Sequence, residues 1–149
     1  MKTSEDKCMV EKVIFGDDIL AIIIYAEYKS EGINFFTPGD FSQQLGYMSH
    51  PKGHQIKPHV HNHVSRNVDY TKEVLLIKSG SLRVDFYNEN QNYLESKVLK
   101  KGDVILLAFG GHGFEVLEEC EIIEIKQGPY AGESDKTRFE PISKELIKL

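Results

Sequence analysis

Cysteine is scarce in this chain. Its 149 residues include only two cysteines, Cys8 and Cys120, which are far apart and outside any C-x-x-C spacing. A domain of this length can bury about 68–70% of its unfolded surface, so a packed core can stabilise it without cross-links. The cysteine content therefore argues against a disulfide-rich scaffold and favours a protein of a reducing compartment.

The chain also lacks long apolar runs and an excess of positive charge. No hydrophobic stretch approaches the about 20 residues of a membrane-spanning helix, and the charged residues 1–7 lack the apolar core of a signal peptide. With 18 Lys and Arg against 23 Asp and Glu, the net charge of −5 offers no positive field to nucleic-acid phosphates. We therefore expect a cytoplasmic protein with neither a membrane nor a nucleic-acid partner.

Short strand-like segments separated by turn residues fill most of the chain. In residues 81–87, apolar side chains alternate with polar or amphipathic ones, which is the period of a strand with two different faces. Further strands are predicted at residues 9–15, 19–25, 34–36, 41–48, 73–78, 93–99, 104–107, 114–117 and 120–127. Short strands at a spacing of about 8–12 residues predict an antiparallel sandwich or barrel.

These elements predict one all-β domain over residues 1–149. Its parts are expected at residues 9–25 (an N-terminal hairpin), about 35–127 (the core barrel) and 130–149 (a tail). In the tail, Ile142, Leu146 and Leu149 follow Pro141 with the spacing of a short helix. A turn is predicted at Ser79-Gly80, between the strands on either side.

Histidines and one carboxylate form the most informative pattern in the sequence. His59 and His61 are one residue apart, and in a strand such neighbours share a face, so both imidazoles can bind the same ion. Glu73 begins the next predicted strand, and His112 lies in a glycine-rich turn after residues 104–107. If these four side chains converge from three strands, they form a divalent-metal site with open coordination positions.

Each of these residues also has a simpler interpretation. His59 and His61 can be surface histidines on an edge strand, and His112 can simply occupy a tight turn between glycines. Glu73 can be a solvated charge at the end of a strand. In that case His63, which has the same parity as His59 and His61, is the substitute ligand.

The histidine segment resembles the first motif of the cupin superfamily, which consists of small jelly-roll barrels. That motif is G-x5-H-x-H, then a Glu followed by x6-G, and the chain matches it at Gly53, His59, His61, Glu73 and Gly80. The chain departs from it in one respect. Eleven residues separate His61 from Glu73, where three or four are usual in the family.

The second cupin motif, G-x5-P-x-G-x2-H-x3-N, is matched more loosely. Gly102 and Gly110 fit, and His112 comes one residue early. Ala108 replaces the proline, and Val116 stands where the asparagine falls when counted from His112. The two motifs together cover about residues 35–127.

The resemblance implies a double-stranded β-helix, the jelly-roll barrel of cupins, with a metal held by His59, His61, Glu73 and His112. This mixed nitrogen and oxygen set accepts Zn, Fe, Mn, Ni or Co. The strings at 111–115 and 124–130 are also similar to small bacterial cupins of surface-polysaccharide biosynthesis. That similarity implies a small polar substrate, a sugar or sugar nucleotide. The exposed edges of such a barrel make a homodimer the expected assembly.

Residues for substrate binding and proton transfer can be nominated as well. Arg66 and Lys126 can hold an anionic substrate group, or they can be solvated charges. Gln44 and Tyr47 can line a ligand cavity, although residues 41–48 are equally typical of a half-exposed strand. Three tyrosines can supply a proton or stack against a sugar: Tyr47, Tyr87 and Tyr130. Two glutamates are candidates for a general base, Glu115 and Glu124. The alternative for all five is an ordinary structural role in the barrel.

Together these expectations favour a metal-dependent enzyme that isomerises or epimerises a carbohydrate derivative. The metal polarises a carbonyl or hydroxyl pair, and a Tyr, Glu or His moves the proton. Oxygen activation by an iron-dependent dioxygenase is a second enzymatic option. A non-catalytic sensor or sugar-binding module is the alternative from another class, because a fold does not determine a function.

Overall fold

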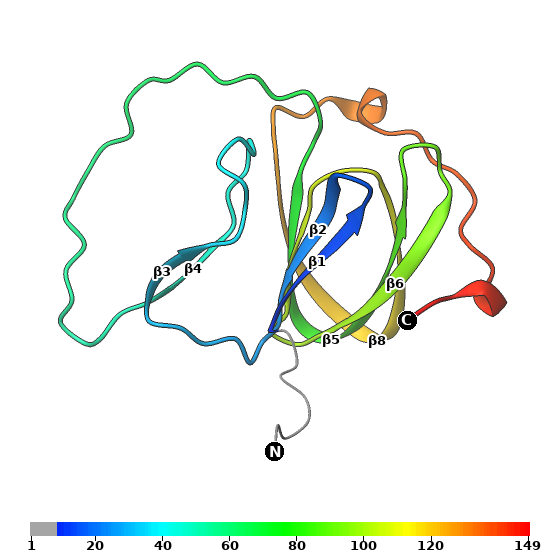
Figure 1. The fold of residues 1–149 in the computed structure, drawn as a ribbon, viewed down its shortest axis with the longest axis horizontal. Helices are drawn as coiled ribbons and strands as arrows, with labels where there is room; N and C mark the ends of the chain where they lie inside the picture. The colour runs from blue at the N-terminus through cyan, green and yellow to red at the C-terminus, as the bar shows by residue number, and fades with distance from the viewer. Residues whose placement is uncertain (1–8) are drawn as a thin grey trace. The chain divides into compact units, whose positions relative to one another are not determined.

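The structure is a computed structural model that describes residues 9–149 (Figure 1). Cys8 and the charged segment 1–7 lie outside the described residues. The chain divides into two compact units, here called unit 1 (the chain up to Tyr28 together with Thr71–Leu149) and unit 2 (Lys29–Tyr70). The expected single domain stays a prediction.

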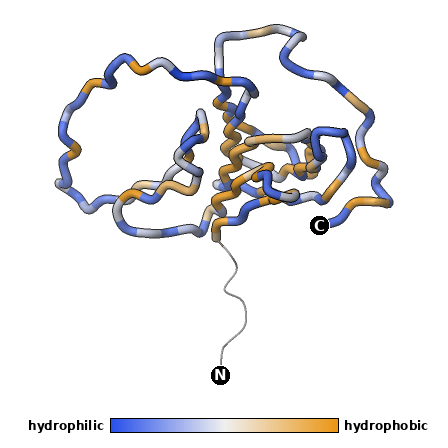
Figure 2. The backbone as a smooth tube through the Cα atoms, turned by 45° about the horizontal axis from the view of Figure 1, so that its top comes forward, coloured by the Kyte–Doolittle hydropathy of each residue, from blue (hydrophilic) through white to orange (hydrophobic). Residues whose placement is uncertain are grey.

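Unit 1 is built on one six-stranded antiparallel sheet, and its described residues contain no α-helix. The strands are β1 (Val10–Phe15), β2 (Asp18–Ile24), β5 (Glu73–Tyr87), β6 (Tyr93–Lys100), β7 (Val104–Leu107) and β8 (Gly111–Lys126). They follow the order β1-β2-β7-β5-β6, and β8 pairs along the other edge of β5. The prediction of an all-β fold is confirmed. In Figure 2 hydrophobic segments gather where the chain of unit 1 runs back and forth, and others are scattered along the loops.

The long strands β5 and β8 bend sharply near their middle (Figure 1). The predicted turn at Ser79-Gly80 and the predicted break between residues 117 and 120 are wrong, because both strands continue through these positions. The β5–β8 register shifts between Ile77 and Leu82 instead, which marks a bulge. Bulges bend a strand without ending it, so the sheet folds over on itself here.

Gly80 makes this bend feasible. Its φ is +77°, and a β-carbon on it would lie 1.9 Å from the backbone oxygen of Glu119 in β8. Only a residue without a side chain allows the two strands to approach so closely in this conformation. Across the bulge, the inward-facing positions of β5 change from Leu75 and Ile77 to Leu82, Val84 and Phe86.

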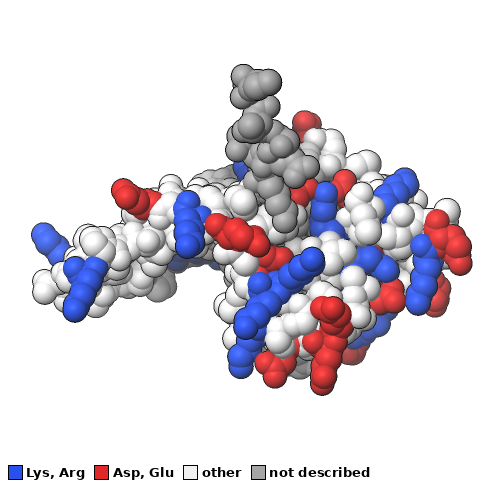
Figure 3. Space-filling view, turned by 90° about the horizontal axis from the view of Figure 1, so that it is seen from below, with Lys and Arg blue, Asp and Glu red and all other residues white. Residues whose placement is uncertain are grey.

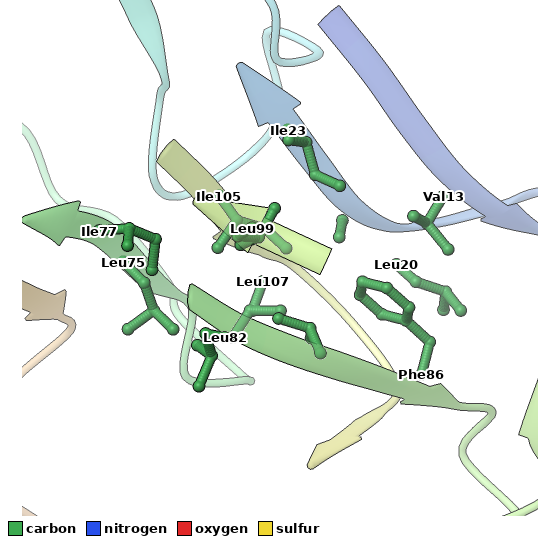
Figure 4. Packing of buried hydrophobic residues seen from close by; sticks show 12 residues of the cluster. Val13, Leu20, Ile23, Leu75, Ile77, Leu82, Phe86, Leu99, Ile105 and Leu107 are labelled. Carbon is green, nitrogen blue, oxygen red and sulfur yellow. The ribbon is translucent and has the colours of Figure 1, made fainter. Parts of the chain in front are cut away.

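The folded sheet encloses one hydrophobic core. Twelve buried side chains from the two halves of the sheet form it: Val13, Leu20, Ala21, Ile23, Leu75, Ile77, Leu82, Val84, Phe86, Leu99, Ile105 and Leu107. Figure 4 shows the labelled members of this cluster packed together. The outermost strands of the β1-β2-β7-β5-β6 path are joined by an ion pair of 2.6 Å between Lys97 of β6 and Glu11 of β1. The sheet is therefore strongly curled into a half-barrel.

The C-terminal segment packs against β5 and β6. The Tyr87 hydroxyl accepts a hydrogen bond from the Ile142 amide at 2.9 Å, and the Tyr93 hydroxyl accepts one from the Lys148 amide at 2.8 Å. The predicted terminal helix is only a 3₁₀ turn, η2 (Lys144–Leu146), which follows the 3₁₀ turn η1 (Gly132–Asp135). A helix over 141–149 would need the Lys148 amide as an internal donor, but that amide donates to the Tyr93 hydroxyl of β6 instead. The Lys148 carbonyl accepts from the Ser96 amide.

Unit 2 contains a two-stranded sheet of β3 (Gly32–Phe35) and β4 (Gly46–Ser49). The predicted strand at 41–48 is thus limited to its last part. Before it, Gln44 is held in a turn, where its amide group donates to the Pro38 and Phe41 carbonyls at 2.9 Å each. From Pro51 to Tyr70 the unit contains no strand.

Candidate functional site

Glu73 and His112 are brought together in unit 1. The His112 Nε2 donates to the Glu73 carboxylate at 3.1 Å. The two residues belong to distant parts of the β5–β8 ladder, since Glu73 pairs with Lys126 and His112 pairs with Phe86, 86 − 73 = 13 residues further along β5. In a flat sheet that separation would be about 43 Å. The contact therefore depends on the bend at Gly80.

Both side chains lie on the concave face of the curled sheet. Glu73 shares its parity with the core residues Leu75 and Ile77, and His112 lies directly opposite the core residue Phe86. The side chain of Glu73 is 13% exposed and that of His112 is 29% exposed, so solvent and a small ion can reach them. The pair is a carboxylate and an imidazole at the accessible rim of the core.

The pKa of Glu73 is lowered from its ordinary value. The main cause is the hydrogen bond from His112, while burial of the carboxylate opposes it. The positive charges of His112, Lys136 and Lys126 lower the pKa further. Glu73 is therefore an anionic group in a locally positive environment. Nothing in the sequence indicated Lys136, because it lies in a polar tail without periodicity.

Acid should remove the stability that Glu73 provides. Because its folded pKa lies below its unfolded one, this contribution is fully present above about pH 4.3 and is lost as the pH falls through the folded pKa. Urea unfolding of metal-free protein should therefore show wild type more stable than Glu73→Gln at pH 7, with the difference shrinking below about pH 4.3. In the control, Glu124→Gln, the removed carboxylate is 47% exposed and lies 4.0 Å from Lys126, so a much smaller difference is expected. A Glu73→Gln difference that stays constant with pH would contradict this assignment.

His59 and His61 lie in unit 2 and are exposed. The prediction that they lie on a strand is wrong, since residues 51–70 pair with no strand, and Pro51 and Pro58 lack the amide protons that a ladder needs. The rings still approach each other edge to face, with centroids 5.3 Å apart, because side chains two apart in extended backbone share a side. His63 follows at the next position of the same parity and is also exposed.

Within neither unit does the described chain gather three or more His, Cys, Asp or Glu side chains as a metal site. Unit 1 brings together Glu73 and His112, and unit 2 brings together His59 and His61. The convergence of all four residues stays a prediction.

The other nominated residues of unit 1 lie in different surroundings. Lys126 lies opposite Glu73 on β8. Glu115 is on the other face of β8 from His112 and binds Arg83 at 2.9 Å and Lys144 at 3.4 Å. Tyr87 is buried, and the C-terminal segment occupies its hydroxyl. Glu115 and Tyr87 therefore do not face the point that Glu73 and His112 share.

Tyr130 and Glu124 remain accessible in unit 1. Tyr130 is 86% exposed, and the Glu124 carboxylate lies 4.0 Å from the Lys126 ammonium group. In unit 2, Gln44 makes structural hydrogen bonds to its own loop, and Tyr47 is half-buried in β4. Arg66 is exposed, and its guanidinium group donates to the Val64 carbonyl at 3.4 Å.

Comparison of the chain with protein-family models, with curated proteins and with solved structures found no match. No helix within residues 9–149 is long and apolar enough to cross a membrane. On the face drawn in Figure 3, Lys and Arg side chains are interspersed with Asp and Glu, so this face has no uniformly basic patch.

Proposed function

We propose that this protein is a metal-binding jelly-roll protein of the cupin type, with His59, His61, Glu73 and His112 as the ligands of one divalent ion. The observation that supports this most is the 3.1 Å contact between Glu73 and His112. The two motifs nominate these residues independently, and the structure brings them into contact. His112 pairs with Phe86, which lies 86 − 73 = 13 residues beyond Glu73 along β5. The spacing of His59 and His61 supplies the other half of the ligand set.

The donor set suits a transition metal. Imidazoles favour Zn, Fe, Ni or Co, and one carboxylate is compatible with these and with Mn. When bound by three imidazoles and one carboxylate, such an ion keeps one or two positions open and acts as a Lewis acid toward a substrate oxygen. The hydrogen bond from His112 lowers the pKa of Glu73 and so favours the deprotonated form that a metal ligand requires.

The ligand class that fits this surrounding is a small polar anion, such as a carbohydrate derivative with a carboxylate or phosphate. Lys126 and Lys136 supply the positive charge near Glu73. Isomerisation or epimerisation requires a proton-transfer group beside the metal. Tyr130 and Glu124 are the accessible candidates, and the half-buried Tyr47 is the third. Membership of surface-polysaccharide biosynthesis is the pathway context that the sequence resemblance suggests.

A non-catalytic binding or sensor protein is the second candidate. It is favoured by the positions of Glu115 and Tyr87, since both candidate proton-transfer groups are engaged by other residues away from His112. Such a protein would use the same ion to hold a sugar or an anion without converting it. Turnover of a stabilising ligand would separate the enzyme from the binding protein.

Metal analysis tests the ligand assignment. Purified wild type, loaded with Zn²⁺ or Co²⁺ and dialysed, should retain about one ion per chain. His112→Ala, His59→Ala and His61→Ala should each weaken binding by more than about tenfold, because each removes one ligand. The matched control is His54→Ala, which removes a histidine outside the proposed set and should bind like wild type. Wild-type metal content in the His112→Ala protein would exclude this residue from the site.

A further inference from the structure

One edge of β8 has no partner strand within the part of unit 1 that the structure describes. β8 has 16 residues and, among the described strands, pairs with β5 alone. It carries six large apolar side chains that are 37–58% exposed: Phe114, Val116, Leu117, Ile122, Ile123 and Ile125. A long edge strand with exposed apolar groups is a template for another strand.

The charge of β8 selects against pairing with a second β8. The strand contains five glutamates and one lysine, a balance of 1 − 5 = −4. In antiparallel pairing about a two-fold axis centred at residue 119, 120 or 121, a glutamate faces another glutamate in every register: Glu119 with Glu119, Glu119 with Glu121, or Glu121 with Glu121. Like charges placed directly opposite destabilise a ladder. A basic strand is the complementary partner for this edge.

The chain itself contains such a segment. Residues 54–64 carry Lys57 and no acidic residue, a balance of +1, together with four of the six histidines. After a turn at residues 51–54, this segment lies outside any sheet, and several of its apolar side chains are well exposed, with Ile56 at 56%, Val60 at 84% and Val64 at 57%.

The side-chain order in residues 54–64 fits an added strand. Ile56, Val60 and Val64 share one side, and Lys57, His59, His61 and His63 share the other. Alternate residues of a strand make the main-chain hydrogen bonds to one neighbour. If the residues that carry the histidine side chains bond to β8, Pro58 falls between them, so its missing amide proton would point away from β8. The segment would present an apolar face and an imidazole face when it is paired.

We propose that residues 54–64 of a second copy of this chain add as a strand to the free edge of β8. His59 and His61 of that copy then face the same side as His112, so that each metal site is completed by two chains. Ile56, Val60 and Val64 would join the outward-facing Ile123 and Ile125. The proposal rests on the proposed metal-binding function. In a two-fold dimer the exchange is reciprocal and covers both β8 edges.

Complementation between two inactive chains tests the sharing of the site. One chain carries His59→Ala and His61→Ala, the other carries His112→Ala, and each has a different affinity tag so that the mixed dimer can be isolated. A site shared between copies leaves one intact and one doubly damaged site in the mixed dimer, so about half of the wild-type Zn²⁺ content should return. Each variant alone should bind little. The corresponding glutamine variants repeat the test if an alanine chain does not fold.

Mixed dimers without bound Zn²⁺ would overturn the proposal while leaving the proposed function intact, since a site within one chain cannot be restored by mixing. Absence of Zn²⁺ binding in wild type would instead overturn the proposed function.

The dimer itself is measured separately, by light scattering of protein kept metal-free with a chelator. Glu118→Lys with Glu121→Lys should weaken wild-type self-association by more than about tenfold, and the control, Glu89→Lys with Glu140→Lys, should not. A monomeric wild type, or an unaffected β8 variant, would also overturn the proposal.

Discussion

Replacing Gly80 with alanine is expected to lower the free energy of unfolding by about 2–5 kcal/mol. The estimate combines about 1–2 kcal/mol for an L-residue with left-handed backbone angles and about 1–3 kcal/mol for an overpacked contact. The contact arises because the new β-carbon would lie 1.9 Å from the Glu119 oxygen, so β8 must shift. Urea unfolding at pH 7, followed by circular dichroism, measures this difference.

Gly132→Ala is the matched control for Gly80→Ala. Its φ of +68° is similarly left-handed, but nothing lies within 4 Å of the added β-carbon. The expected cost is therefore only the backbone term, about 1–2 kcal/mol. Equal destabilisation by the two substitutions would mean that the close approach of β5 and β8 at Gly80 does not exist in the protein.

Phe86→Ala is expected to cost about 3–5 kcal/mol, the usual range when a buried phenylalanine is truncated. Phe86 is 1% exposed and belongs to the core that the curled sheet encloses. It also lies directly opposite His112 on β8. The cavity left by Phe86→Ala should therefore weaken metal binding as well as stability, which parallel unfolding and Zn²⁺ titrations would measure.

The matched control for Phe86→Ala is Phe15→Ala in β1. Phe15 is 46% exposed and outside the core cluster, so its truncation should cost about 1 kcal/mol and leave Zn²⁺ affinity unchanged. A Phe86→Ala protein as stable as the Phe15→Ala protein would contradict the core described here.

The strands could be predicted largely because their side-chain patterns are local. Leu82, Val84 and Phe86 face one side with period two, whereas β2 and β7 are short continuous apolar runs. The course of β5 through Gly80 could not be predicted, because a Ser-Gly dipeptide is also a turn signal. Whether such a glycine ends a strand or bulges within it depends on the partner strand, here β8, which is distant in the sequence.

The candidate site was predictable only in part, because the motif spacing is local but the faces of the strands are not. The motif spacing nominated Glu73 and His112 together, and the bend of the sheet places them in contact. The sequence did not reveal that Glu115 faces Arg83 on the opposite side of β8, because the face of each residue depends on the register between strands. The segment carrying His59 and His61 was expected to be a strand on its alternation alone, but a strand also requires a partner and free amide protons.

X-ray absorption spectroscopy of the Zn²⁺-loaded protein tests the central claim most directly, because it counts the imidazole and oxygen ligands of the bound ion. Three imidazoles, one carboxylate oxygen and one or two further oxygens are expected in wild type, falling to two imidazoles in His112→Gln. An ion surrounded by oxygens alone, or an imidazole count that His112→Gln leaves unchanged, would contradict the assignment of His59, His61, Glu73 and His112 as one metal site.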